Sequence, residues 1–132
     1  MSFEVITGDL PPTKLPFSPA TRAGGFVFVS GQASTDESGN IVLDTFENEM
    51  RRTIGHVQRI LAAAGLTLRD VVQLRGYVSD PADWDEYNRI YRDYFTEPFP
   101  ARTTILKCLG KIKVEIDVVA YDDGGGAGDG AR

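Results

Sequence analysis

The sequence is poor in the residues that build cross-links and metal centres. Among its 132 residues, Cys108 is the only cysteine and His56 is the only histidine. One cysteine excludes an internal disulfide and a zinc cluster of several thiolates, and no other set of metal ligands is apparent. A lone histidine also excludes a nucleophilic Ser-His or Cys-His pair assembled around a second histidine. We expect Cys108 to be a small buried apolar residue, and His56 to be exposed or at an interface.

Long apolar runs and a basic surface are also absent. No segment approaches the roughly 20 apolar residues that a membrane-spanning helix requires, and residues 1–10 lack the apolar core of a signal peptide. The net charge is −5, from 14 basic and 19 acidic residues, which disfavours neutralisation of nucleic-acid phosphates. We therefore expect a cytoplasmic protein with neither a membrane nor a nucleic-acid partner.

The periodicity of the apolar residues predicts two helices and five strands. Spacings of three and four predict a helix over residues 44–64, capped by Asp44 or Thr45 and ended by Gly65. A second helix is predicted over residues 81–95. The aromatic residues along one side of this helix are Trp84, Tyr87, Tyr91 and Tyr94. Strands are predicted at residues 3–7, 26–30, 70–78, 102–108 and 112–121.

This order of elements predicts an α+β domain over residues 1–121, with two helices on one face of a mixed sheet. The last two strands are expected to be joined by a tight connection at Gly110. One face of the strand at 70–78 is expected to carry Val72, Leu74, Gly76 and Val78. Residues 122–132 are rich in glycine, have no apolar residue larger than alanine, and are expected to form a disordered tail.

The last predicted strand has two unlike faces. One face is apolar and consists of Ile112, Val114, Ile116, Val118 and Ala120. The other face consists of Lys113, Glu115, Asp117, Val119 and Tyr121. The apolar face must cover the helices, whereas the second face is either solvated or buried at an edge or subunit interface. The pattern alone leaves these alternatives open.

Three motifs place polar groups where a ligand can reach them. Arg102 follows residues 99–101 (Phe-Pro-Ala), which fix the chain just before a strand, and its guanidinium suits bidentate binding of a carboxylate. Gly31, after Ser30 at a strand end, allows close approach to the backbone. Asn88 lies on the second helix. The ordinary alternatives are a surface salt bridge, a bulge or turn, and a solvent-facing amide.

Several segments occur together in a recognisable order. They are Phe26 to Gln32 (FVFVSGQ), Ala62 to Leu66 (AAAGL), Asp70 to Val72, Asn88 with Tyr91 and Phe95, Phe99 to Arg102 (FPAR), and Val114 to Ala120 (VEIDVVA). In this order they resemble the RidA/YjgF/YER-type (L-PSP endoribonuclease-like) family of reactive-intermediate deaminases, across residues 3–121. The most specific part is the Pro-Ala-Arg element followed downstream by the Glu-Ile strand.

The resemblance implies a chorismate-mutase-like fold that assembles as a homotrimer, with helices outside and sheets facing the central core. Three sites would lie in clefts between neighbouring subunits. In each cleft, Arg102 and Glu115 from two adjoining strands would meet. The second face of the last strand would then be buried by partner subunits.

The implied activity is hydrolysis of 2-imino and enamino acids to 2-oxo acids and ammonia, without a metal or organic cofactor. The resemblance assigns Arg102 to the substrate carboxylate, and Glu115 to the attacking water and the proton transfers. The other expected substrate-binding residues are Phe17, Ser30, Gly31, Asn88 and the backbone at Thr104.

Two departures from the family pattern place the substrate in question. Phe17 stands where deaminating members often carry a tyrosine, and Thr104 replaces a cysteine found in some bacterial members. Two alternatives are therefore kept. One is a deaminase specific to a single pathway, of aminoacrylate or aminomuconate type, and the other is a trimeric, chaperone-like protein that binds 2-oxo acids without turnover. RNA cleavage, a label given to some members, fits an acidic chain with one histidine poorly.

Overall fold

The computed structural model describes residues 2–124, which form six strands and two α-helices. The strands are β1 (Glu4–Ile6), β2 (Ala20–Ala23), β3 (Phe26–Gln32), β4 (Val71–Val78), β5 (Ala101–Leu106) and β6 (Val114–Tyr121). The helices are α1 (Phe46–Ala63) and α2 (Trp84–Tyr94), with short 3-10 helices η1 (Leu68–Asp70) and η2 (Pro81–Asp83).

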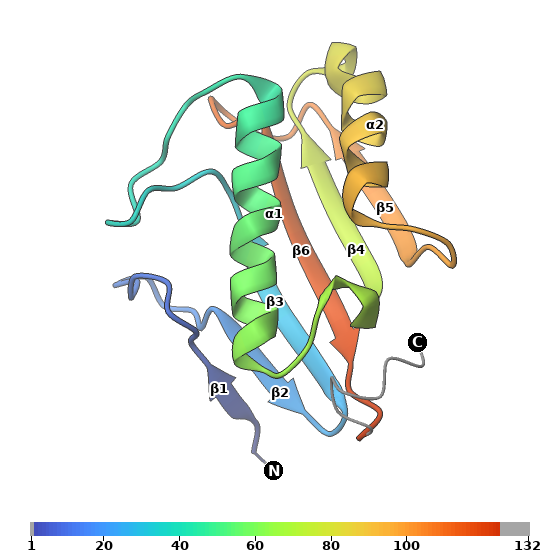
Figure 1. Cartoon of the computed structure of the whole chain (residues 1–132). Coiled ribbons are helices and arrows are strands. Elements are labelled where there is room, and N and C mark those ends of the chain that lie inside the picture. The colour runs from blue at the N-terminus through green and yellow to red at the C-terminus, as the bar shows by residue number, and fades with distance from the viewer. Residues whose placement is uncertain (1, 125–132) are drawn as a thin grey trace.

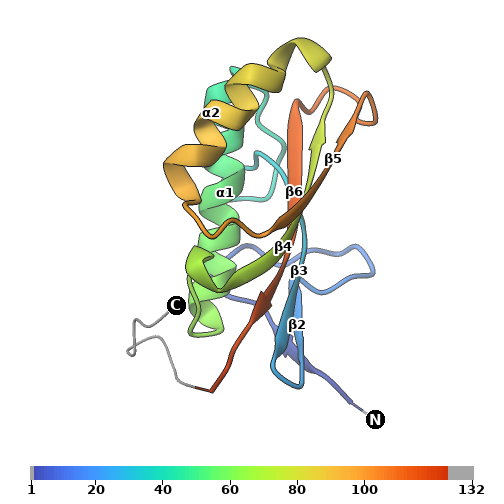
Figure 2. The same cartoon turned by 90° about the vertical axis from the view of Figure 1, so that its right-hand side faces the viewer.

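The strands form one sheet in the order β1-β2-β3-β6-β4-β5. Strands β4 and β5 are parallel, and the other neighbouring pairs are antiparallel. Figure 1 shows both helices in front of the sheet, and the turned view in Figure 2 shows that they lie on the same side of it. The predicted α+β class, the mixed sheet and the placement of both helices on one face are confirmed.

The helix α1 agrees closely with its prediction. Thr45 caps its start, because the Thr45 hydroxyl accepts a hydrogen bond from the backbone N–H of Asn48 at 3.1 Å. Gly65, with a φ of 79°, follows its end in the left-handed conformation that glycine adopts without strain. The apolar face of α1 buries Phe46, Met50, Ile54, Val57, Ile60 and Leu61 in the core.

The second predicted helix is divided into η2 and α2. The Asp80 side chain accepts a hydrogen bond from the backbone N–H of Ala82 at 2.9 Å, which caps η2 rather than α2. Within α2, Tyr87 and Tyr91 are buried in the core, whereas Trp84 is exposed. The aromatic side of this helix is therefore only partly a core surface.

The register of β4 differs from the prediction at one residue. A bulge between Val71 and Gln73 shifts the pairing of β4 with β6. The side chain of Val72 therefore does not join the buried face, and Val72 is 40% exposed. Leu74 and Val78 are fully buried beneath the helices, as predicted.

Two features of the connectivity also differ from the prediction. The strand β2 was not predicted, and it forms an antiparallel hairpin with β3 across Gly24 and Gly25. Strands β5 and β6 are not neighbours, because β4 lies between them and β5 is joined in parallel to β4 through α2. The connection at Gly110 therefore links two strands that do not pair.

The two faces of the sheet are unlike. On the helix side, Val114, Ile116, Val118 and Ala120 of β6 are buried, as the alternating pattern predicted. On the uncovered side, Phe26 and Tyr121 pair across β3 and β6 with ring centres 5.0 Å apart, and both stay exposed. Phe28, also on β3, is 44% exposed. The uncovered face is thus apolar in part.

The expectations for Cys108 and His56 were wrong. Cys108 is exposed, because it lies in the connection beyond the end of β5. His56 is buried where α1 faces the turn after β3, and its Nε2 lies 2.9 Å from Thr35 Oγ1 and 3.1 Å from the Thr35 backbone oxygen. His56 therefore ties that turn to the helix.

The predicted tail begins in ordered structure. Asp122 accepts a hydrogen bond from Arg22 Nη1 at 3.1 Å, and its backbone N–H donates to the Gly25 oxygen at 2.7 Å. The rest of the predicted tail, residues 125–132, lies outside the described residues. In the part that is described, neither helix has the length and apolar character needed to cross a membrane.

Candidate active site

Arg102 lies on β5 and faces the helix layer, since its neighbour in register is the buried Leu74 of β4. Its guanidinium carbon lies 5.6 Å from the ring centre of Trp84, 5.0 Å from that of Tyr87 and 4.8 Å from that of Tyr91. All three rings belong to α2. Cation–π contacts of this kind orient a positive charge without neutralising it. Arg102 is therefore held in place while its charge stays available to an anion.

A cavity of about 230 Å³ lies beside Arg102. It is lined by Asn88, Tyr91, Arg92, Phe99, Pro100 and Arg102. The Asn88 side-chain nitrogen donates a hydrogen bond to the backbone oxygen of Trp84 at 3.1 Å, which orients the amide on α2. Two predicted substrate-binding residues, Arg102 and Asn88, thus share one cavity.

Two further lining residues, Tyr91 and Arg92, were not singled out as binding residues from the sequence. A signal was present, because they lie three and four positions after Asn88 and so share a helix face with it. The aromatic spacing of Tyr91 instead suggested a core role. That role is real, but Tyr91 also borders the cavity.

Thr104 lies two residues after Arg102 and faces α2 as well. Its Oγ1 lies 3.1 Å from the Tyr87 hydroxyl, and the two share a hydrogen bond. Thr104 is opposite Gly76 of β4, where an added Cβ would collide with the Tyr87 hydroxyl. Burial raises the pKa of Tyr87, and the Thr104 hydrogen bond and the Arg102 charge oppose that shift. The Thr104 side chain is thus engaged by the protein itself.

Glu115 lies on β6 and faces the uncovered side of the sheet, opposite Tyr77 of β4. A Cβ at Gly31 of β3 would collide with the Glu115 carboxylate, so glycine at this position leaves the carboxylate room to lie against β3. Burial, followed by the negative charge of Asp117, raises the pKa of Glu115. A carboxylate with a raised pKa is a stronger base than an ordinary one once it is ionised.

Asp117 lies two residues along the same face and is held by two side chains of β4. Arg75 Nε donates a hydrogen bond to it at 2.9 Å, and the Tyr77 hydroxyl donates another at 2.8 Å. These contacts fix the position of the charge that acts on Glu115. From the sequence, Asp117 was placed on this face but given no role.

Ser30 and Phe17 lie near neither Asn88 nor the cavity beside Arg102. The Ser30 hydroxyl donates to the backbone oxygen of Ser18 at 2.6 Å, and Ser30 helps to line a second cavity of about 320 Å³. Phe17 lies in the loop before β2 and is exposed. Both are therefore separate from the residues that line the cavity beside Arg102.

The predicted site residues form two groups on opposite faces of the sheet, which Figure 2 shows nearly edge-on. Arg102 and Thr104 face the helices, together with Asn88 of α2, whereas Gly31 and Glu115 face away from them. The meeting of Arg102 and Glu115 across a subunit boundary stays a prediction. Within one chain they lie on strands that do not pair, because β4 separates β5 from β6. One chain alone therefore does not bring the guanidinium and the carboxylate together.

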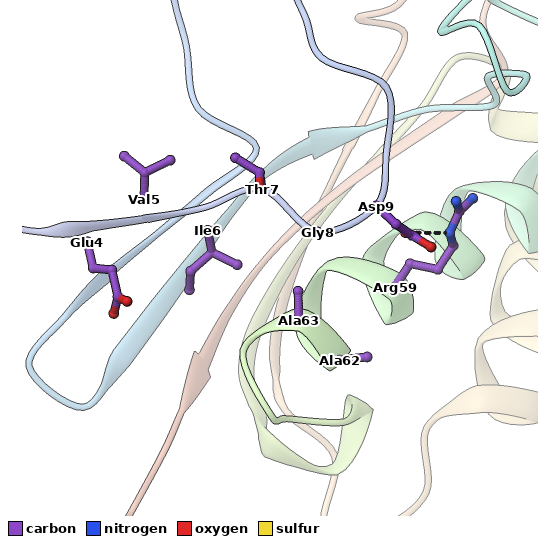
Figure 3. A pocket seen from close by; sticks show the side chains of 9 residues that line it. All are labelled: Glu4, Val5, Ile6, Thr7, Gly8, Asp9, Arg59, Ala62 and Ala63. Atoms are coloured by element: carbon purple, nitrogen blue, oxygen red, sulfur yellow. Dashed lines mark hydrogen bonds and ion pairs between the residues drawn. The ribbon is translucent and has the colours of Figure 1, made fainter.

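A larger cavity, of about 640 Å³, lies between β1 and the last turns of α1 (Figure 3). It contains none of the predicted residues, and its arginine, Arg59, already forms an ion pair with Asp9 at 3.1 Å. The residues that line this cavity include no unpaired arginine and no unpaired carboxylate. Among residues 2–124, the structure places no group of three or more His, Cys, Asp or Glu side chains to hold a metal ion.

Comparison with known proteins identifies the family. The sequence profile described as Endoribonuclease L-PSP matches residues 7–122. The chain belongs to this family. The resemblance inferred from the sequence motifs is thereby confirmed, and it extends over nearly all of the described residues.

Relatives in the Endoribonuclease L-PSP family include proteins named as deaminases. The 3-aminoacrylate deaminase RutC of Acinetobacter baylyi is 32% identical over 117 residues, covering 88% of this chain and 93% of the relative. The chloroplastic Reactive Intermediate Deaminase A of Arabidopsis thaliana is 32% identical over 121 residues, covering 89% of this chain and 65% of the relative. Because a relative is named as chloroplastic, a cytoplasmic location stays a prediction.

The fold agrees with solved structures of the same family. The crystal structure of a putative endoribonuclease from Thermotoga maritima matches with a TM-score of 0.83 at 31% sequence identity. The match covers 93% of this chain and 99% of the other. The sheet order and the position of the two helices are therefore those of an established family fold.

Proposed function

We propose that this protein hydrolyses 2-imino and enamino acids to 2-oxo acids and ammonia, in clefts formed where copies of the chain meet. The observation that carries the proposal is Arg102, whose guanidinium is fixed on three aromatic rings beside a cavity and forms no ion pair with a described carboxylate. A fixed and unpaired guanidinium suits a small carboxylate substrate. The names of the two deaminase relatives support the reaction class.

The second half of the proposed site is Glu115 of a neighbouring copy. Glu115 and Arg102 lie on opposite faces of one sheet, so an assembly must supply the pair to a single ligand. The exposed aromatic residues Phe26, Phe28 and Tyr121 lie on the same face as Glu115 and provide apolar surface for such an assembly. A homotrimer, with three equivalent clefts, is the arrangement we propose.

The roles of the two residues follow from their charges. Arg102 binds the substrate carboxylate and so places the neighbouring imine carbon in the cleft. Glu115 accepts a proton from a water molecule as the water oxygen forms a bond to the carbon of the protonated imine, and the electron pair of the C=N bond moves to the nitrogen, which becomes a neutral amine. Glu115 then returns this proton to the nitrogen, and the C–N bond breaks to release ammonia. The remaining hydroxyl loses its proton to solvent and becomes a carbonyl.

The reaction is balanced without an oxidant or reductant. One C=N group and one water give one C=O group and one ammonia, and Glu115 ends in the protonation state in which it began. An enamino acid enters the same sequence after a proton moves to its β-carbon, which converts it to the imine. The raised pKa of Glu115 suits both directions of proton transfer.

Trapping of an imine tests the proposed reaction. An amino-acid oxidase converts 2-aminobutyrate to its imine, and semicarbazide traps the imine in competition with hydrolysis. We expect the purified protein to suppress formation of the semicarbazone and Arg102→Ala to lose this effect. Equal trapping with and without the protein would defeat the proposal for this substrate.

Mixing two inactive variants tests the shared cleft. Arg102→Ala and Glu115→Gln should each be inactive alone, but subunits exchanged between them should form some clefts with an intact Arg102 and an intact Glu115. We expect exchange, by dilution and reconcentration of a mixture, to restore part of the activity. Activity that is never restored, although mass spectrometry shows mixed assemblies, would place both residues in one chain's site and contradict the proposal.

RNA cleavage, which the family description mentions, is not supported by a comparable site. His56 is buried and hydrogen-bonded to Thr35, so it is poorly placed for acid–base chemistry on RNA. The net charge of −5 also disfavours an RNA partner.

A further inference from the structure

Eight arginines of residues 2–124 fall into two classes by their ion pairs. Six of them form ion pairs with carboxylates: Arg22, Arg51, Arg52, Arg59, Arg75 and Arg89. Arg92 and Arg102 form no ion pair with any carboxylate of residues 2–124. Both of these arginines line the same cavity of about 230 Å³. The protein thus leaves two positive charges unneutralised at one small site.

The rest of the lining strengthens the preference for an anion. None of the residues that line this cavity is acidic. Arg92 makes only a long hydrogen bond, 3.4 Å, from Nη1 to the backbone oxygen of Asn88. Tyr91 is a third lining residue, and its ring centre lies 4.8 Å from the Arg102 guanidinium carbon.

Two unpaired arginines on one cavity favour a particular kind of anion. A ligand with one carboxylate brings one negative charge to a cavity lined by two positive charges. A ligand with two carboxylates neutralises both arginines at once. The fixed position of Arg102 on its three rings and the more exposed position of Arg92 on α2 suit a ligand with one anchored end and one end nearer to solvent.

We propose that the substrate is a dianion, namely a short-chain 2-imino or enamino dicarboxylic acid. This inference rests on the proposed deaminase function and narrows its substrate class. Arg102 binds the carboxylate next to the imine carbon, as for any 2-imino acid. Arg92 binds the distal carboxylate and is the residue that determines specificity, and the small volume of the cavity favours a short chain between the two groups.

Paired substrates and a matched control test the role of Arg92. Suitable oxidases generate the imine of aspartate, which has two carboxylates, and the imine of 2-aminobutyrate, which has one, with catalase present to remove peroxide. The variants are Arg92→Ala and Arg92→Lys, with Arg89→Ala as the control. Arg89 lies on the same helix but is paired with Glu47 and Glu86 and does not line the cavity.

We expect the protein to prefer the imine of aspartate, and Arg92→Ala to lower the ratio of kcat/KM between the two imines by about tenfold or more, the loss typical of a charged hydrogen bond. Arg92→Lys should recover part of the ratio, and Arg89→Ala should leave it unchanged. Turnover of both imines with a ratio that Arg92→Ala does not alter would overturn the dianion inference and leave the deaminase function standing.

Calorimetry separates the two proposals if no imine is hydrolysed. Binding of 2-oxoglutarate and of 2-oxobutanoate is measured with the same variants. Tighter binding of 2-oxoglutarate that depends on Arg92, without turnover of any imine, would refute the deaminase function and retain the dianion site. Equal binding of the two acids, or a preference that survives Arg92→Ala, would refute the dianion site.

Discussion

The two faces of the sheet carry different kinds of residue. The helix-covered face holds most of the buried apolar residues and, at its β5 edge, Arg102 among the aromatic rings of α2. The uncovered face holds Glu115 and Asp117 beside exposed aromatic residues such as Phe28. The difference teaches that one face is packed within the single chain, whereas the other leaves aromatic side chains exposed.

The largest expected effect is on catalysis. It distinguishes Glu115, the proposed base on the uncovered face, from Arg102, the proposed binding residue on the helix-covered face. Glu115→Gln removes the base but keeps the shape of the side chain, so we expect kcat to fall by about 10²–10⁴-fold with little change in KM. Arg102→Lys keeps the positive charge but loses the planar guanidinium, so we expect mainly a rise in KM. Steady-state kinetics on the preferred imine measures both, and the reverse pattern would exchange the roles of the two faces.

The second effect compares the loss of an apolar side chain on each face. Leu74→Ala empties a fully buried position under the helices, and we expect it to lower the free energy of unfolding by about 2–5 kcal/mol. Phe28→Ala removes a side chain that is 44% exposed in one chain, so we expect a smaller loss of subunit stability but weaker association. Urea denaturation and sedimentation velocity measure the two quantities. Unchanged association in Phe28→Ala would mean that this part of the uncovered face is not an interface.

The smallest expected effect is on the pH dependence of kcat, which we attribute to Glu115 on the uncovered face. Burial and the charge of Asp117 raise the pKa of Glu115, and the base must be ionised to act, so kcat should fall as the pH drops through this raised pKa. Asp117→Asn removes one cause and frees the positive charge of Arg75, and both changes lower the pKa of Glu115. The acid limb of the pH–rate profile should therefore move to lower pH. Glu37→Gln, in the exposed turn after β3, is the control that should leave it in place, and an acid limb that Asp117→Asn leaves unmoved would contradict this electrostatic coupling.

Local features of the fold were predictable from the sequence, and nonlocal ones were not. The boundaries of α1 follow from apolar spacing, the Thr45 cap and Gly65, all of which act within a few residues. The hairpin of β2 carried a local signal in Gly24 and Gly25 that was missed because β2 is short and not strongly apolar. The position of β4 between β5 and β6 depends on contacts between distant segments, which periodicity does not encode.

The candidate site shows the same limit. The family motifs named Arg102 and Glu115, but the pattern could not say that they project from opposite faces of one sheet. The rings around Arg102 were read as core residues, since helical spacing gives the same pattern for packing and for holding a cation. Arg92 belonged to no motif, and it is distinguished from Arg89 only in the structure, where it lacks an acidic partner and lines the cavity.

Arg102 and Glu115 lie on opposite faces of the sheet, and this placement affects the protein concentration that activity requires. If each active site is shared between two chains, dilution below the dissociation constant of the assembly would abolish turnover although every chain remains folded. Specific activity would then rise with protein concentration. An inactive variant chain that assembles with wild-type chains would also inactivate the sites that it shares with them. The rate of substrate hydrolysis per chain would therefore depend on the protein concentration as well as on the intrinsic activity of each site.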